Sequence, residues 1–106
     1  MYSYEELLGR SESDDEIVVA FADAMDLLGI FEEHSTEVLG WEGWIKYPDG
    51  TFGHSQKYQG TGDLSSMSQA AAIALIKSTI TQAQNEWQEQ PEVSNAKLLF
   101  CITTNT

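Results

Sequence analysis

The stretch "LGWEGWIKYPDGTFGHS", residues 39–55, decides the fold, because apolar side chains alternate with polar or small ones until they reach a turn. A period of two is typical of a half-buried strand. Pro48-Asp49-Gly50 suits a type I turn followed by a glycine at positive φ, a common hairpin loop. The stretch therefore predicts two antiparallel strands, and the core-facing side of the first carries Leu39, Trp41, Ile45 and Tyr47, with Gly43 among them.

The turn also predicts the register of the hairpin. Pairing of Tyr47 with Thr51 places Trp44 opposite His54, and the same count places Glu42 opposite Gln56. The second face of the hairpin then mixes aromatic and polar groups, as the centres of interfaces do. Its members are Val38, Glu42, Trp44 and Lys46 from the first strand and Phe52, His54 and Gln56 from the second.

A helix is expected before the hairpin. Ser13 is a natural N-cap, and the acidic residues 14–16 favour the positive end of a helix dipole. An apolar stripe at three- and four-residue spacing follows, made of Ile17, Ala20, Phe21, Ala24, Met25 and Leu28. We expect Gly29 to interrupt or end this helix, and we expect a short helical turn before it that ends at Gly9.

A second helix and a last strand are expected after the hairpin. Ser66 and Gln69 have the spacing of a capping box, and Pro91 ends the helix. Its apolar stripe consists of Ile73, Ile76, Ile80, Ala83 and Trp87. The run "AKLLFCITT", residues 96–104, is continuously apolar and short for a helix, which predicts a buried central strand.

These elements follow the order helix, strand, strand, helix, strand. The predicted fold class is α+β: a two-layer sandwich in which a small, mostly antiparallel sheet of about three strands is covered on one face by two helices. Residues 1–106 are expected to form a single domain, because a chain of this length supports one core.

The chain is strongly acidic. Its net charge is −12, and twelve of its seventeen acidic residues lie within residues 1–42, where Arg10 is the only basic residue. A field of this sign repels phosphate and attracts basic partners, so we expect no direct binding to nucleic acid or to an anionic membrane. With no signal-peptide pattern and no apolar run long enough to span a bilayer, the chain is expected to be soluble and cytoplasmic.

Few residues in the sequence could carry catalysis or hold a metal. His34 and His54 lie outside any His-x-x-x-His or Cys-x-x-Cys spacing, which gives no support for a zinc site. Cys101, the single cysteine, lies in the most apolar run of an acidic protein, where a reactive thiolate is disfavoured. "GTGD", residues 60–63, lacks the lysine and the glycine spacing of a phosphate loop. We therefore predict no enzyme activity, no cofactor and no metal.

The sequence instead predicts a surface that binds a basic protein. Exposed carboxylates raise the encounter rate with such a partner, and aromatic side chains supply buried anchors. The candidates for steering and salt bridges are Asp14, Asp15, Glu16, Asp23 and Asp26; the candidate anchors are Glu42, Trp44, Phe52 and His54. Nuclease toxins are basic proteins of this kind, because their active-site clefts hold phosphates. An acidic protein can occupy such a cleft by presenting carboxylates where phosphates would lie.

The stretches "VLGWEGWIKYPDGTFGHS", "GTGDLSSMS" and "AAIALIKSTITQAQNEW" resemble a pattern of small bacterial immunity proteins. The resemblance covers about residues 38–87 and depends mainly on the Gly-Trp-Glu-Gly-Trp strand and its hairpin. Such proteins are encoded beside secreted polymorphic or contact-dependent growth-inhibition toxins, and they protect the producing cell by binding the toxin domain. The resemblance implies a protein that neutralises a cognate toxin by covering its active site or an adjacent surface. It implies no individual binding residue.

Other classes of function use the same features. An acidic mimic of nucleic acid would inhibit a host DNA-binding protein, and a small self-associating adaptor would use the hairpin face to dimerise. The sequence leaves the oligomeric state open. An enzyme hypothesis depends on Cys101 and His54 alone.

Overall fold

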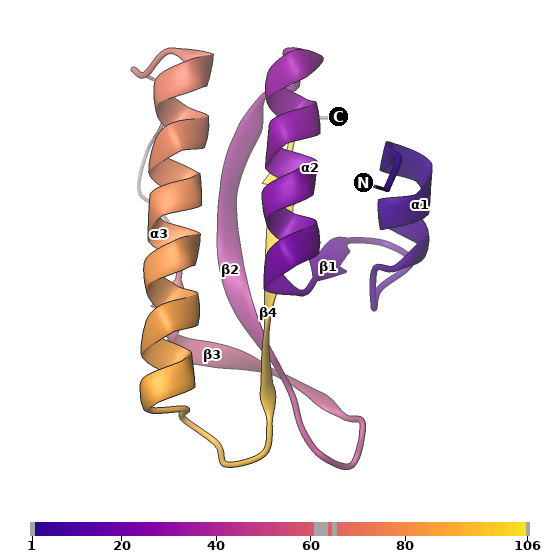
Figure 1. The fold of residues 1–106 in the computed structure, drawn as a ribbon, viewed down its shortest axis with the longest axis vertical. Helices are drawn as coiled ribbons and strands as arrows, with labels where there is room; N and C mark the ends of the chain where they lie inside the picture. The colour runs from indigo at the N-terminus through magenta and orange to yellow at the C-terminus, as the bar shows by residue number, and fades with distance from the viewer. Residues whose placement is uncertain (1, 61–63, 65, 106) are drawn as a thin grey trace.

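The computed structural model describes residues 2–60, 64 and 66–105, which Figure 1 shows as a ribbon. Along these residues the elements are α1 (Tyr4–Gly9), β1 (Ile17–Val19), α2 (Phe21–Glu33), β2 (Val38–Lys46), β3 (Phe52–Gln59), α3 (Gln69–Glu89) and β4 (Lys97–Thr104). The strands form one antiparallel sheet in the order β1-β4-β2-β3, and α2 and α3 lie side by side on one of its faces. The α+β sandwich is therefore confirmed, and β1 is a fourth strand that the sequence did not predict.

β4 is the centre of the sheet, as its continuous apolar run predicted. Leu98, Phe100 and Ile102 face the helices and belong to the main core, whereas Leu99 and Cys101 point to the opposite face. All five are buried, because β4 has a strand on each side and side chains packed on both faces. Because both faces of β4 are buried, apolar and polar residues do not alternate along its sequence.

The helix expected from Ser13 onward begins later, at Phe21. The preceding β-branched residues Ile17–Val19 form β1 and pair with Phe100–Ile102 of β4. The hydroxyl of Ser13 accepts hydrogen bonds from the backbone N–H groups of Asp15 and Glu16, so it closes a turn without starting a helix. Expecting a single helix over this segment was wrong, because the unpaired edge of β4 decides its conformation.

Gly29 neither interrupts nor ends α2, which continues to Glu33. The helix buries Ala24, Leu27, Leu28, Ile30 and Phe31 against the sheet and α3. His34 is the C-cap residue of α2.

A bulge at the start of β2 reverses the predicted orientation of two residues. Val38 pairs with Thr104 and Gly40 pairs with Thr103, so Leu39 is an extra residue in the ladder. Val38 is consequently buried in the core, whereas Leu39 is 48% exposed. Beyond the bulge, the predicted alternation of β2 is correct.

The hairpin register is confirmed next to the turn and wrong beyond it. Tyr47 donates its backbone N–H to the carbonyl of Thr51, and Trp44 lies opposite His54. Glu42, however, lies opposite Gln59, because β3 carries extra residues at a second irregularity. There Ser55 turns inward, and its hydroxyl accepts the backbone N–H of Tyr58.

α3 begins at Gln69 with Ser68 as its N-cap, two residues after Ser66, the N-cap of the predicted capping box. The Ser68 hydroxyl accepts the backbone N–H of Ala71. The Gln69 side chain instead donates to the backbone carbonyls of Phe31 and Thr36, which links α3 to the end of α2. The predicted stripe of α3 is buried, and the helix ends at Glu89, ahead of Pro91.

The segment "GTGD" falls largely outside the described residues, which resume at Leu64 and again at Ser66. In the part of the chain that the structure describes, none of the helices has the length and apolar character needed to cross a membrane.

Candidate functional site

The sheet face opposite α2 and α3, here called the outer face, has its own small hydrophobic cluster. Val18, Leu99 and Cys101 are buried there, and the Trp44 ring packs against them. The segment before β1 adds further cover, since the Glu12 carboxylate forms an ion pair with Lys46 of β2 at 3.0 Å. The outer face is therefore partly covered by side chains from β2 and from the segment before β1.

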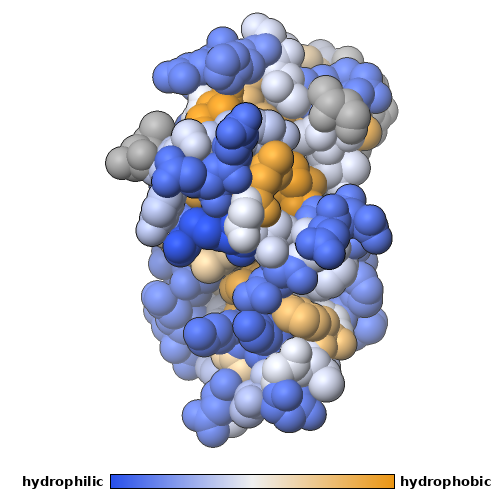
Figure 2. Space-filling view, turned by 90° about the vertical axis from the view of Figure 1, so that its right-hand side faces the viewer, coloured by the Kyte–Doolittle hydropathy of each residue, from blue (hydrophilic) through white to orange (hydrophobic). Residues whose placement is uncertain are grey.

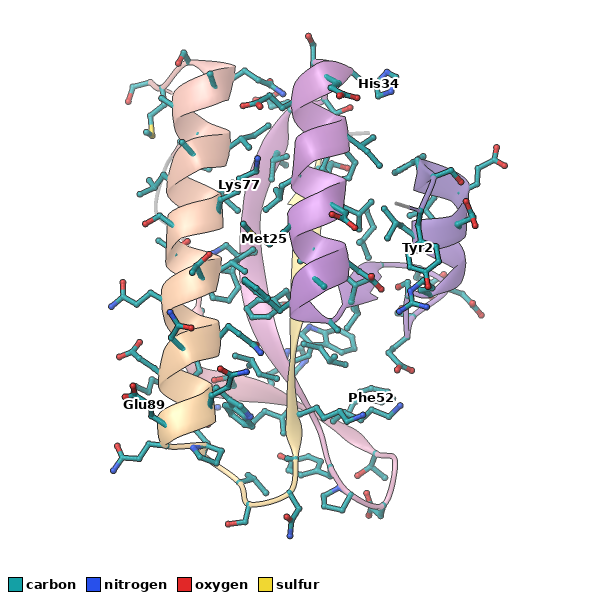
Figure 3. All side chains as sticks on the ribbon, viewed as in Figure 1. Tyr2, Met25, His34, Phe52, Lys77 and Glu89 are labelled. Atoms are coloured by element: carbon teal, nitrogen blue, oxygen red, sulfur yellow. The ribbon has the colours of Figure 1, made fainter. Side chains whose placement is uncertain are left out.

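Four predicted anchors come together beside this cluster and form what we call the hairpin patch: Glu42, Trp44, Phe52 and His54. The Trp44 ring meets Phe52 and His54 edge-on, with ring centroids 6.2 Å and 5.1 Å away. Trp44 Nε1 donates to Glu42 Oε1 at 3.3 Å, and His54 Nδ1 lies 3.9 Å from the same oxygen. Phe52 is 41% exposed. Figure 3 shows it near the hairpin, at the opposite end of the molecule from His34, which is therefore not part of this patch. The patch combines a fixed tryptophan with exposed rings and one carboxylate.

Three predicted steering residues form the acidic loop: Asp14, Asp15 and Glu16, all exposed directly before β1. Ser11 organises this loop, because its hydroxyl donates to the carbonyls of Ser13 and Glu16 and accepts the backbone N–H of Val18. The Ser13 hydroxyl accepts two further N–H groups from the loop. These carboxylates therefore stand on a hydrogen-bonded turn.

The two remaining candidates lie on α2 and have different environments. Asp23 is 6% exposed, and its carboxylate accepts a hydrogen bond from Arg10 Nε at 2.7 Å. The pKa of Arg10 is raised by this hydrogen bond and by the charge of Asp23. Arg10 also stacks on Tyr2, 4.5 Å from the ring centroid. Asp23 thus holds α1 against α2, and because it is buried it does not belong to the proposed binding surface. Asp26 lies on the same helix and is half-buried.

Cys101 joins the acidic loop to the hairpin patch, a contact that the sequence did not predict. Its Sγ and one carboxylate oxygen each of Glu16 and Glu42 all lie within 4.8 Å of one another. Burial, followed by the charges of Glu16 and Glu42, raises the pKa of the Cys101 thiol to about 12. The thiol is therefore protonated at neutral pH, which disfavours it as a nucleophile. Pairing of Glu42 with Cys101 across the β2–β4 ladder was the missing information.

A groove of about 410 Å³ lies beside the edge strand β1, and we call it the N-terminal groove. Tyr4 and Leu8 of α1 form one wall, the acidic loop forms the rim, and the half-buried Ile17 contributes apolar surface. Figure 2 looks onto this side of the molecule, where hydrophobic surface is enclosed by hydrophilic residues. This groove could not be predicted from the sequence, because it depends on how α1 folds back beside the sheet.

Comparison of the chain with protein-family models, with curated proteins and with solved structures returned no match. Function is therefore inferred from the side chains and their arrangement.

Proposed function

We propose that this protein is a cytoplasmic immunity protein that binds and neutralises a cognate bacterial toxin of the nuclease class. The single observation that carries this proposal is the continuity of two surfaces. Glu16 belongs to the acidic loop and Glu42 to the hairpin patch, and their carboxylates lie within 4.8 Å of each other. Charge for steering and aromatic surface for anchoring therefore adjoin, as a high-affinity protein interface needs.

The sign of the charge supports a basic partner. The Arg10 guanidinium is directed to Asp23, and Lys46 is paired with Glu12, so these two cations do not neutralise the acidic loop. A nuclease cleft binds phosphates through basic side chains, and carboxylates on a hydrogen-bonded turn can occupy the same positions. Covering the cleft, or a surface next to it, would exclude the nucleic acid.

The test is co-purification of this chain with the product of the adjacent upstream gene, with each also expressed alone. A stable complex, together with toxicity of the neighbour that this chain abolishes, supports the proposal. A harmless neighbour that does not bind this chain contradicts it.

Two measurements separate this function from the other classes. A nucleic-acid mimic would inhibit DNA-binding proteins unrelated to the neighbouring gene, so activity against a panel of them would favour mimicry. A self-associating adaptor would show at least twice the monomer mass in solution without any partner. We expect a monomer, because two copies of net charge −12 repel each other.

A further inference from the structure

We propose that the N-terminal groove is the subsite that receives a lysine or arginine side chain of the partner polypeptide. This inference rests on the proposed function and adds to it the place on the surface where a basic residue enters. The groove adjoins the hairpin patch through Cys101, which lines the groove and lies beside Glu42.

The walls of the groove suit the aliphatic part of a long basic side chain. Leu8 is 38% exposed and Tyr4 is 40% exposed, so α1 presents apolar and aromatic surface to the groove. Ile17, half-buried in the edge strand β1, adds apolar surface. Lysine and arginine bury their methylene stems along surfaces of this kind while the charged group stays at a polar rim.

The rim of the groove supplies the opposite charge. Asp14, Asp15 and Glu16 all line it, and none of the described lining residues is basic. Ser11 and Ser13 fix the backbone of the rim through the hydrogen bonds described above. A loop ordered before binding loses less conformational entropy when a partner arrives.

A second groove in the same molecule provides a contrast. It measures about 340 Å³ and is lined by both acids and bases, including Arg10, Glu12, Asp23 and Lys46. Its two acids are already paired with its own cations, Asp23 with Arg10 and Glu12 with Lys46. In the N-terminal groove, by contrast, no base lies among the lining residues that the structure describes, so a basic side chain from outside is the complementary occupant.

Other occupants fit this charge poorly. A second copy of this chain would bring another net charge of −12, and nucleic acid would bring phosphates, so each would meet the rim with like charge. A basic polypeptide is the class that matches both the apolar walls and the acidic rim.

The experiment is an NMR titration of the isotope-labelled full chain with a blocked tetralysine peptide, beside a blocked tetraglutamine peptide of equal length. We expect saturable shifts for backbone amides of Leu8, the acidic loop, Ile17 and Ile102–Thr103 with tetralysine only. The triple variant Asp14→Asn/Asp15→Asn/Glu16→Gln should raise the dissociation constant at least about fivefold, since three exposed ion pairs together give this order of effect.

A matched variant makes the same change of net charge away from the groove: Glu32→Gln/Glu33→Gln/Glu89→Gln. All three residues are exposed, and none lines the groove. We expect it to change the dissociation constant less than about twofold, because none of these three carboxylates lines the groove. Leu8→Ser should also weaken binding while leaving its salt dependence unchanged, since it removes apolar wall without removing charge.

Equal weakening by the two triple variants, or shifts spread over the acidic surface without the groove, would overturn the groove proposal. Two further results distinguish failure of the groove proposal from failure of the proposed immunity function. A toxin that binds the wild type and the Asp14→Asn/Asp15→Asn/Glu16→Gln variant equally keeps the immunity function and removes the groove as its subsite. Tetralysine binding in the groove without any toxic neighbour keeps the subsite and removes the immunity function.

Discussion

Trp44 has two roles: it packs in the fold, and it is the proposed anchor for a partner. One part of its ring packs on Val18, Leu99 and Cys101, and its edges meet Phe52 and His54. A side chain fixed by packing loses little rotamer freedom when a partner binds, which is typical of anchor residues. The packing that prepares Trp44 for binding also makes it part of the fold.

We expect Trp44→Ala to lower the free energy of unfolding by about 1–3 kcal/mol, because it uncovers the buried cluster on the outer face. Phe52→Ala is the matched control on the same patch. Phe52 is 41% exposed, so its loss should stay below about 1 kcal/mol. Urea denaturation of the three proteins measures both values, and equal losses would mean that Trp44 does not cover the cluster.

The Cys101 thiol gives a pH-dependent prediction. Its pKa is about 12 in the folded chain, raised mainly by burial, against an ordinary value of 9.0. Between these values the unfolded chain releases a proton that the folded chain retains, so stability is full below pH 9 and falls as the pH rises through this interval. Denaturation midpoints of wild type and Cys101→Ser across that range measure the difference, and parallel curves would contradict the assignment.

The same thiol should react differently after its two carboxylate neighbours are neutralised. We expect Glu16→Gln/Glu42→Gln to lower the pKa of Cys101 without returning it to the ordinary value, because burial, the larger cause, remains. The pH dependence of alkylation by iodoacetamide in the folded protein measures this pKa. An unchanged profile would show that the carboxylates do not act on the thiol.

At the scale of the elements, the docking of α1 depends on a charge pair. Arg10 follows α1 and reaches the buried carboxylate of Asp23 on α2, while Tyr2 stacks on the Arg10 guanidinium. We expect Arg10→Met to accelerate amide hydrogen exchange throughout α1 by about an order of magnitude, with little change in α3. Arg10→Met/Asp23→Asn should slow it again in part, because the unpaired buried charge is then removed. Uniform acceleration in both helices would indicate global destabilisation instead.

The close approach of β2 and β3 depends on Gly43. A Cβ atom added there would lie 2.6 Å from the backbone oxygen of Tyr58, which sits after the irregularity of β3. We expect Gly43→Ala to lower the free energy of unfolding by about 1–3 kcal/mol, since backbone must shift to admit the methyl group. Gly29→Ala is the control, because that site has open space within α2 and alanine favours a helix. Equal effects of the two substitutions would contradict this explanation.

The elements also show which parts of the fold the sequence could predict. α3 and β4 were predictable because their patterns are local: one is a stripe at helical spacing, and the other is an uninterrupted apolar run. β1 was not predictable, because residues 17–19 become a strand only beside β4, which is distant in the sequence. The displacement of Leu39 had the same cause, since a bulge is defined by the partner strand.

In the candidate site, too, local contacts could be predicted from the sequence and long-range contacts could not. Alternation along the hairpin correctly grouped Trp44, Phe52 and His54, whose contacts lie close to the turn. It could not predict that Glu16 would meet Glu42 over Cys101, or that Asp23 would be buried under Arg10. Both arrangements depend on the path of residues 2–16 across the assembled fold.

At the scale of the whole molecule, the charge distribution and the hairpin patch should act on different kinetic steps. The acidic field acts before contact, so the variant Asp14→Asn/Asp15→Asn/Glu16→Gln should lower the association rate with the cognate toxin by up to about tenfold at low salt. Raising the salt should shrink this difference, because the field is screened. Trp44→Ala should leave association within about twofold and speed dissociation at least about tenfold, since a buried anchor acts after contact. Stopped-flow association at two salt concentrations, with dissociation followed by competition, separates the two steps. A Trp44→Ala variant whose loss of affinity lies wholly in association would show that the hairpin patch does not anchor the partner.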